Sequence, residues 1–240
     1  HCSNVVGEIN PVAKITALAH AAGAFVCVDG VSYAPHGFPD VGALGPDIYL
    51  FSAYKTYGPH QGLMVLRRHL AESLPNQGHH FNGCTLYKRF TPAGPDHAQV
   101  AACAGMADYV DALYAHHLKD DAKPAARGKA VHDLMRAHEV SLLQPLLDAL
   151  SARNSVRLLG PSTAHNRAPT VAVALNRPAE PVAAQLARRG IMAGGGDFYA
   201  GRALKGMGID PNDGVLRLSF THYTTKAEVD QLLNALDDVL

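Results

Sequence analysis

The N-terminal part of the chain has an apolar pattern that predicts one helix followed by three strands. A helical pattern opens at Pro11 and stops at Gly23. Apolar runs predict strands at 24–28, 47–52 and 62–67, and the first run is nearly continuous, as in a strand buried on both faces. This order indicates an α/β fold with a mostly parallel sheet and flanking helices. The predicted inner face of the helix consists of Val12, Ile15, Leu18, Ala19 and Ala22.

The middle of the chain predicts an irregular segment and two helices. Residues 75–95 are rich in Gly, Pro, Asn and His, which is typical of an excursion from the core. Asp96 is a candidate cap of a helix that runs to about His117. A second helix is expected over 125–150, broken or kinked near Pro145.

The last part predicts a smaller α+β arrangement. Thr225 and Glu228 fit a capping box at the start of a closing helix. Before that helix we expect strands near 156–159, 169–175 and 215–220 and a helix at 180–189. The chain then divides into a sheet domain over 1–95, a bridging helix within 96–124 and a smaller domain over 125–240.

Composition excludes several classes of function. Lys and Arg together number 21, as do Asp and Glu, so the formal net charge is zero and no basic stripe indicates nucleic acid or a membrane surface. No apolar run is long enough to span a bilayer. The four cysteines form no close pair, which favours free thiols in a reducing cytoplasm. The 14 histidines follow no metal-ligand spacing, so we expect no metal site.

Two charged residues follow neighbouring predicted strands. Asp29 comes directly after the strand at 24–28, and Lys55 comes just past the strand at 47–52. A lysine can form a Schiff base with an aldehyde, and a carboxylate can pair with a pyridinium nitrogen. These are the two protein groups that pyridoxal 5'-phosphate chemistry most needs.

With these residues placed, the chain resembles the class V aminotransferase and cysteine desulfurase-like family of pyridoxal phosphate enzymes, of fold type I. The resemblance runs through essentially all 240 residues. Four ordered motifs carry it: His1–Gly7 as H-x-S-N-x-x-G, Asp29 in Val-Asp-Gly, residues 51–59 as the lysine motif, and Arg217-Leu218-Ser219 as R-x-S. It implies that 1–95 is the C-terminal part of the large cofactor-binding domain and that 125–240 is the small C-terminal domain.

The resemblance implies a role for each of five residues. Lys55 forms the Schiff base (aldimine) and later moves the α-proton, while Asp29 keeps the pyridine nitrogen protonated. Ser52 donates to the cofactor phosphate, Asn4 contacts the cofactor or the substrate carboxylate, and Arg217 binds that carboxylate with its bidentate fork. Each of these residues could instead have a purely structural role. The alternatives are a solvated lysine, a helix-capping aspartate, a turn serine, a loop-capping asparagine and a solvent-facing arginine.

The chain also departs from the family pattern. Ser32 stands where many relatives have glutamine, and Tyr54 stands where histidine is common, so both remain candidate cofactor-binding residues with altered contacts. Residues 93–95 read Ala-Gly-Pro instead of Gly-Thr-Pro. Residues 191–199 hold no cysteine where desulfurases carry the persulfide-accepting thiol, which disfavours desulfuration. The glycines at 194–196 form either a mobile gate or a permissive turn.

We therefore expect a pyridoxal phosphate enzyme that acts on a small amino acid or amine, by transamination or by α,β-elimination as a lyase. The resemblance also implies a homodimer. The chain starts at His1 and lacks the family's N-terminal stretch, so we expect an N-terminally truncated piece that binds the cofactor weakly or not at all unless the missing part is supplied. The rival hypotheses are a non-catalytic relative that keeps the fold and, last, a nucleotide-binding sheet, for which no glycine-rich phosphate motif is present.

Overall fold

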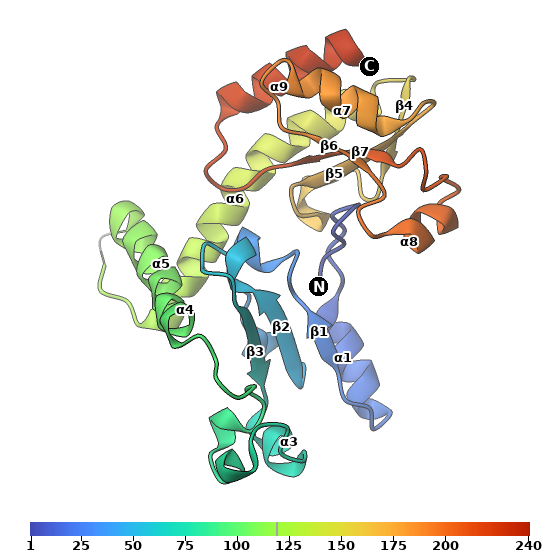
Figure 1. Ribbon diagram of the computed structural model, residues 1–240. Coiled ribbons are helices and arrows are strands. Elements are labelled where there is room, and N and C mark those ends of the chain that lie inside the picture. Colours follow the sequence, from blue (N-terminus) through green and yellow to red (C-terminus); the bar gives the residue numbers. More distant parts are fainter. Residues whose placement is uncertain (119) are drawn as a thin grey trace. The chain divides into compact units, whose positions relative to one another are not determined.

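A computed structural model gives the fold of residues 1–118 and 120–240, and the chain divides into two compact units (Figure 1). Unit 1 comprises His1 and residues 11–132, and unit 2 comprises residues 2–10 and 133–240. Residues 2–10 thus lie with the second unit. The chain passes from unit 1 to unit 2 between residues 132 and 133, beyond the predicted end of the bridging segment at 124. The three-part division predicted for the whole protein stays a prediction, and residue 119 of its bridging segment lies outside the described residues.

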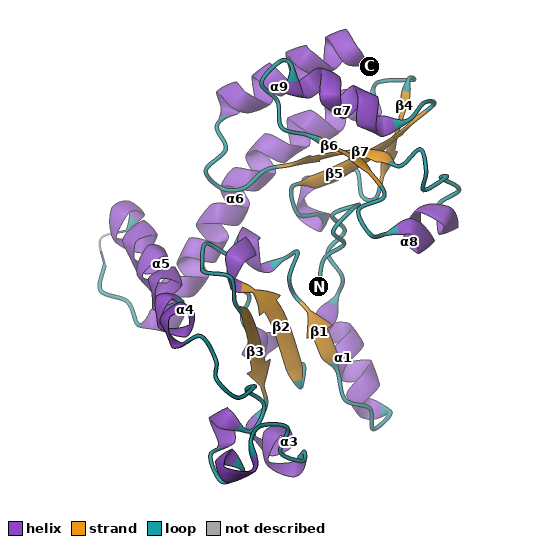
Figure 2. Cartoon of the chain, in the orientation of Figure 1, coloured by secondary structure: helices purple, strands orange, loops and turns teal. Residues whose placement is uncertain are grey.

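Unit 1 contains a three-stranded sheet in the order β1-β2-β3. Strand β1 is parallel to β2, whereas β3 is antiparallel to β2, as the opposed arrows in Figure 2 show. The helices and strands of this unit are α1 (Val12–Ala21), β1 (Cys27–Asp29), α2 (Val41–Leu44), β2 (Ile48–Ser52), β3 (Gly62–Leu66), α3 (Arg68–Ser73), α4 (His97–Ala102), α5 (Ala104–His117) and the start of α6 (Pro124–Ser151).

The expectation of a mostly parallel sheet needs correction. The described strands form one small mixed sheet in unit 1 and one antiparallel sheet in unit 2. The link between β2 and β3 covers only residues 53–61. A connection that returns a strand in the same direction needs about a dozen residues or more, so β3 has to run antiparallel to β2.

Helix α1 forms where the sequence predicts it, but its buried side differs from the predicted one. Val12 and Thr16 are buried, whereas Ile15 and Leu18 are 48% and 66% exposed. The apolar cluster in which α1 meets the sheet is small, because three short strands offer few side chains to cover a helix. Its buried members are Val12, Val28 and Tyr49.

Unit 2 is built on a four-stranded antiparallel sheet in the order β4-β5-β7-β6. The predicted strands and helices of this part are present, and β6 and α8 are additional to them. Besides the rest of α6, its elements are β4 (Val156–Leu159), β5 (Thr170–Leu175), α7 (Ala179–Ala187), β6 (Gly194–Gly196), α8 (Gly201–Gly206), β7 (Val215–Ser219) and α9 (Lys226–Val239).

The two faces of this sheet have different cores. Helices α6, α7 and α9 bury one face through leucines and valines, among them Leu147, Leu186 and Leu236. The other face packs against segment 2–10 and α8 through Val5 and Leu204. Helix α6 continues through Pro145 without a break, because the leucines on both sides of the proline are held in the first core.

The capping box of α9 is present as predicted and offers a test of local stability. The Thr225 hydroxyl accepts from the Glu228 N–H at 3.2 Å, and the Glu228 carboxylate accepts from the Thr225 N–H at 2.7 Å. We expect Thr225→Ala to lower the free energy of unfolding by about 1 kcal/mol, measured by urea denaturation. Thr225→Ser keeps the hydroxyl and should lie near the wild type, and an equal loss in both variants would contradict the capping role.

Candidate functional site

Asp29 and Lys55 lie at the same edge of the sheet of unit 1. Asp29 is the last residue of β1, and Lys55 ends the 3₁₀ turn Ala53–Lys55 that directly follows β2. The two strands are parallel, with Asp29 opposite Leu50, so their carboxyl ends share one edge. Open α/β sheets bind their ligands at this edge.

The turn that carries Lys55 is firmly anchored while the lysine side chain is exposed. Ala53 is fully buried, and its N–H donates to the carbonyl of Gln61 at 2.8 Å. Thr56 is also fully buried, and its hydroxyl donates to the carbonyl of Ser52 at 2.9 Å. The backbone therefore holds the lysine in place and leaves its amine accessible.

The residue after this turn has an unusual backbone. Tyr57 has a φ of 64°, in the left-handed region that non-glycine residues rarely adopt. Its hydroxyl donates to the carbonyl of Pro35, and its ring lies 5.3 Å from that of Tyr109. Such conformations persist where the surroundings over-determine them, and they cluster at functional sites.

Both charged groups of this edge lack an ionic partner among the described residues. The Lys55 ammonium lies 5.9 Å from the centre of the Tyr54 ring and makes no ion pair there. One oxygen of Asp29 accepts from the N–H of Val31 at 2.9 Å, which is an Asx turn, and the other oxygen makes no hydrogen bond with described residues. The amine and one carboxylate oxygen are thus available to a ligand.

The residues present fit the chemistry of pyridoxal phosphate. The group requires an amine for its aldehyde and a carboxylate for its pyridine nitrogen, and Lys55 and Asp29 supply both at one sheet edge. Ser32 and Ser52 are half-buried, and their hydroxyls make no hydrogen bond with described residues, so both remain available to a phosphate or phenolic oxygen. The Tyr54 ring stacks instead on a histidine, 4.7 Å from the ring of His60.

Aromatic rings near Asp29 were not identified from the sequence as part of this edge. The ring of His1 stacks on Tyr33 at 3.7 Å, and its Nδ1 lies 2.9 Å from the hydroxyl of Tyr49. A Cβ on Gly30 would lie 2.2 Å from the Tyr49 ring, so only glycine allows the chain to pass there. The available signal was Tyr33 in the turn after β1 and Tyr49 within β2.

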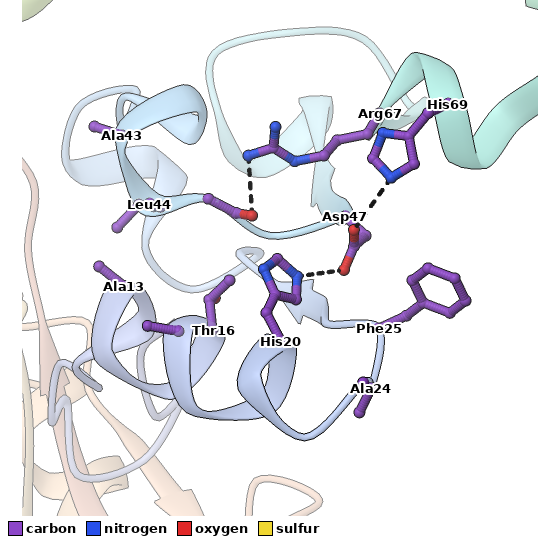
Figure 3. Close-up of a pocket in the computed structure, with 13 residues that line it drawn as sticks. Ala13, Thr16, His20, Ala24, Phe25, Ala43, Leu44, Asp47, Arg67 and His69 are labelled. Atoms are coloured by element: carbon purple, nitrogen blue, oxygen red, sulfur yellow. Dashed lines mark hydrogen bonds and ion pairs between the residues drawn. The ribbon is translucent and has the colours of Figure 1, made fainter.

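A pocket of about 630 Å³ lies elsewhere in unit 1, at the amino ends of β1 and β2 (Figure 3). Its centre is Asp47, whose side chain is 4% exposed and accepts from the Val26 N–H at 2.8 Å. His20 Nε2 lies 2.8 Å from one Asp47 oxygen, and His69 Nε2 lies 3.9 Å from the other. Arg67 donates from Nε to the carbonyl of Pro46 at 2.9 Å.

This cluster ties the loop before β2 to the start of β1. Burial by itself would raise the pKa of the Asp47 carboxyl, but the hydrogen bond from Val26 and the contact with His20 outweigh it and lower that pKa. The carboxylate is therefore held in its charged form by its neighbours. We interpret the cluster as structural and call it the Asp47 clamp. It lies at the amino ends of β1 and β2, whereas Asp29 lies at the carboxyl end of β1.

Arg217 and Asn4 come together in unit 2. Arg217 lies half-buried on β7, and its Nη1 donates to the backbone carbonyl of Asn4 at 2.9 Å. The guanidinium lies 3.9 Å from the centre of the Phe198 ring. Burial lowers the pKa of Arg217, and no acidic residue pairs with it among the described residues. Arg217 is therefore half-buried and held by these contacts, unlike an arginine that only faces solvent.

Asn4 lies in a tight turn within the His1–Gly7 motif. Its side-chain amide donates to the carbonyl of Phe198 at 2.9 Å. The neighbouring Ser3 hydroxyl accepts from the N–H groups of Val5 and Val6 at 3.3 and 3.2 Å, so Ser3 caps the turn and Asn4 does not. Sequence reasoning missed Phe198, because nothing in the sequence around 191–199 distinguishes it from a loop aromatic.

The predicted site residues thus form two groups, each described within its own unit. Unit 1 holds Asp29, Ser32, Ser52, Tyr54 and Lys55, and unit 2 holds Asn4 and Arg217. Within the described residues, no cluster of three or more His, Cys, Asp or Glu could hold a metal ion. No helix in the described ranges has the length and apolar character needed to cross a membrane.

Comparison with known proteins gives a consistent family match. The model of the family described as aminotransferase class-V matches residues 1–127 and 128–232. An aminotransferase-like protein of Gibberella zeae is 31% identical over 245 residues, and a probable cysteine desulfurase of Pseudomonas putida is 32% identical over 253 residues. Among solved structures, the cysteine desulfurase CsdA from Escherichia coli aligns with a TM-score of 0.77 at 26% identity.

These matches cover nearly all of this chain but only part of each relative. The alignments span 100% and 99% of this chain against the two relatives, and 58% and 57% of the relatives themselves. The structural alignment covers 99% of this chain and 57% of the desulfurase. The chain therefore spans less than three fifths of the length of the proteins it matches.

The Asp47 clamp predicts a pH-dependent stability. A carboxyl whose pKa is lower in the folded state stabilises it above the unfolded pKa of about 3.9, and this stabilisation is lost as the pH falls through the folded pKa. We expect Asp47→Asn to lower the free energy of unfolding by about 1–3 kcal/mol near pH 7, measured by urea denaturation, and the difference should shrink below about pH 4.

The matched control for this prediction is His69→Asn. His69 is 68% exposed and lies at the longer distance from Asp47, so its loss should change the free energy of unfolding by less than about 0.5 kcal/mol. A difference between wild type and Asp47→Asn that stays constant from neutral to acid pH would contradict the clamp.

Proposed function

Because the chain belongs to the class-V aminotransferase family, we propose that it carries the lysine of a pyridoxal phosphate-dependent enzyme acting on a small amino acid or amine. The observation that carries the proposal is the placement of Asp29 and Lys55 at the carboxyl ends of two adjacent parallel strands. Neither residue has an ion-pair partner among the described residues, so both remain available for this chemistry. We also propose a homodimer, as is common for this family.

Each residue of the first group has a distinct task in this proposal. The Lys55 amine would hold the cofactor through its aldehyde and would take and return the proton at the substrate α-carbon. The free oxygen of Asp29 accepts the pyridine N–H. Ser52 donates to the phosphate, and Ser32 and Tyr54 contribute further polar contacts. When bound, the cofactor supplies an electron sink for the substrate carbanion.

Arg217 has the task of binding the substrate carboxylate. Its half-buried guanidinium has no acidic partner among the described residues, so an incoming carboxylate would provide the missing counter-charge. Its Nη1 is already engaged by Asn4, which fixes one end of the fork.

We propose transamination or α,β-elimination and not desulfuration through a loop thiol. Residues 191–199 hold no cysteine. In the first motif, burial raises the pKa of Cys2 to about 11, and its thiol contacts the carbonyl of Gly7 at 3.4 Å. The nucleophile in persulfide chemistry is the thiolate, and Cys2 forms very little of it near neutral pH.

The lysine assignment is tested by cofactor titration. We expect added pyridoxal phosphate to form a covalent adduct that borohydride fixes on Lys55, as located by absorption spectroscopy and peptide mass mapping. Lys55→Ala should remove the adduct, and Asp29→Asn should weaken cofactor binding about 10- to 100-fold, because a charge-assisted hydrogen bond contributes about 1.5–3 kcal/mol.

Lys14→Ala is the matched control, since Lys14 is an exposed lysine on α1. It should leave the adduct unchanged. Labelling that is spread evenly over the lysines, or that persists in Lys55→Ala, would overturn the assignment and favour a non-catalytic relative that keeps the fold.

A further inference from the structure

We propose that Phe198 is a positioning residue that orients the Arg217 guanidinium, so that one edge of it faces a small carboxylate. The proposal rests on the proposed carboxylate-binding role of Arg217 and adds a residue to which no role has been assigned. The contacts of Phe198 are with Asn4 and Arg217 and not with the cofactor-binding lysine. Phe198 acts only through the arginine.

The Phe198 ring lies in space that is open because residue 194 is a glycine. Strand β6 pairs with β7 so that Gly194 lies opposite Arg217. A Cβ on Gly194 would lie 2.8 Å from two carbon atoms of the Phe198 ring, closer than such contacts allow. The ring therefore occupies the space that a side chain at 194 would fill, and this position brings it onto the neighbouring arginine.

The glycines at 194–196 form a strand and not the turn that was one of the two expectations for them. This strand, β6, lies at the edge of the sheet. A Cβ on Gly195 would lie 2.5 Å from the backbone of Glu180, whereas a Cβ on Gly196 would meet nothing within 4 Å. Close packing therefore explains the glycines at 194 and 195, and the φ of 145° favours glycine at 196.

The contacts among Phe198, Asn4 and Arg217 form a closed set. The guanidinium carbon lies 3.9 Å from the Phe198 ring centre, within the range of a cation–π interaction. Arg217 Nη1 donates to the Asn4 carbonyl, and the Asn4 amide donates to the Phe198 carbonyl, both at 2.9 Å. The ring and the carbonyl together restrict both the tilt and the rotation of the guanidinium.

The backbone at Phe198 is fixed in an uncommon conformation. Phe198 and Tyr199 have φ values of 52° and 60°, two consecutive non-glycine residues in the left-handed region. The carboxylate of Asp197 accepts from the Tyr199 N–H at 3.2 Å and secures this turn. The Phe198 ring is half-buried against the arginine, whereas the Tyr199 side chain is fully exposed.

Part of the Arg217 guanidinium remains available to a ligand. Nη1 is engaged by Asn4, and one face of the guanidinium is covered by the ring. The Nε and Nη2 groups make no hydrogen bond with described residues, and neither is a buried unpaired atom. Two adjacent N–H donors on one edge match the two oxygens of a carboxylate. These two donors fit the carboxylate that Arg217 is proposed to bind.

The test uses nuclear magnetic resonance of the chain with ¹⁵N-labelled arginine and sodium acetate as the probe, at constant ionic strength. A guanidinium above an aromatic ring gives an upfield Nε–H proton signal, which Phe198→Leu should move downfield. Acetate should shift the Arg217 Nε–H signal in the wild type. We expect Phe198→Leu to weaken acetate binding about tenfold, since a desolvated cation–π contact contributes roughly that factor.

Two further variants separate positioning from a general loss of structure. Gly194→Ala keeps the Phe198 ring but fills the space that the ring occupies, so it should reproduce both effects of Phe198→Leu. Phe198→Tyr keeps an aromatic ring and should restore the wild-type signal and affinity. Tyr199→Leu is the matched control, because it removes the adjacent exposed ring, and it should leave Arg217 unchanged.

The outcomes distinguish this inference from the function on which it rests. If acetate does not shift Arg217 in the wild type, the carboxylate role fails and the positioning role fails with it. If acetate binds the wild type, Phe198→Leu and Gly194→Ala with equal affinity, the carboxylate role stands and the role of Phe198 is overturned.

Discussion

The parallel pairing of β1 with β2 is the constraint on which the lysine site depends. Three residue pairs, from Cys27 with Ile48 to Asp29 with Leu50, set the direction of both strands. The N–H of Gly30 extends this ladder by donating to the Leu50 carbonyl at 2.7 Å. An antiparallel arrangement would put the carboxylate and the amine at opposite edges. The chemistry of unit 1 therefore follows from the direction of a very short strand.

Segment 2–10 has a comparable role in unit 2, because it carries Asn4 to the sheet. Arg167 is fully buried and donates to the carbonyl of Leu159 at 2.8 Å and to that of Thr170 at 3.2 Å. Burial lowers its pKa to about 10, so it stays charged at neutral pH. Gly7 passes so close that a Cβ there would lie 2.3 Å from the Thr170 carbonyl. The Ala168 N–H donates to the Gly7 carbonyl at 2.8 Å, so the chain next to Arg167 holds the segment that contacts Arg217.

Much of the fold could be predicted from local patterns, and the failures have two different causes. The elements on either side of Lys55 and the cap at Thr225 depend on nearby residues, and their positions followed from the sequence. The direction of β3 follows from the short link over 53–61, whereas the buried side of α1 depends on what the rest of the chain supplies. Periodicity placed Ile15 in the core, although the residue is exposed. The pattern shows that a helix is amphipathic but not how much sheet is available to cover it.

The candidate site was predictable to a similar extent. Asp29 and Lys55 stand at strand ends, where sequence order alone places them at one edge. The contact between Phe198 and Arg217 depends on the register of β6 against β7, and a run of three glycines carries no pattern that reveals register. Strand register and turn conformation are set by tertiary packing, so residues that act through them are found only once the structure is known.

The burial of Cys2 determines how the chain responds to oxidants. Peroxide and disulfide exchange act on thiolates, so a thiol with a raised pKa inside the first motif is protected from both. Cys27 and Cys84 are exposed and are the thiols that oxidants and alkylating reagents reach first. Covalent cross-links between copies of the chain would then form at these two surface positions, while the turn that carries Asn4 keeps its packing in an oxidising solution.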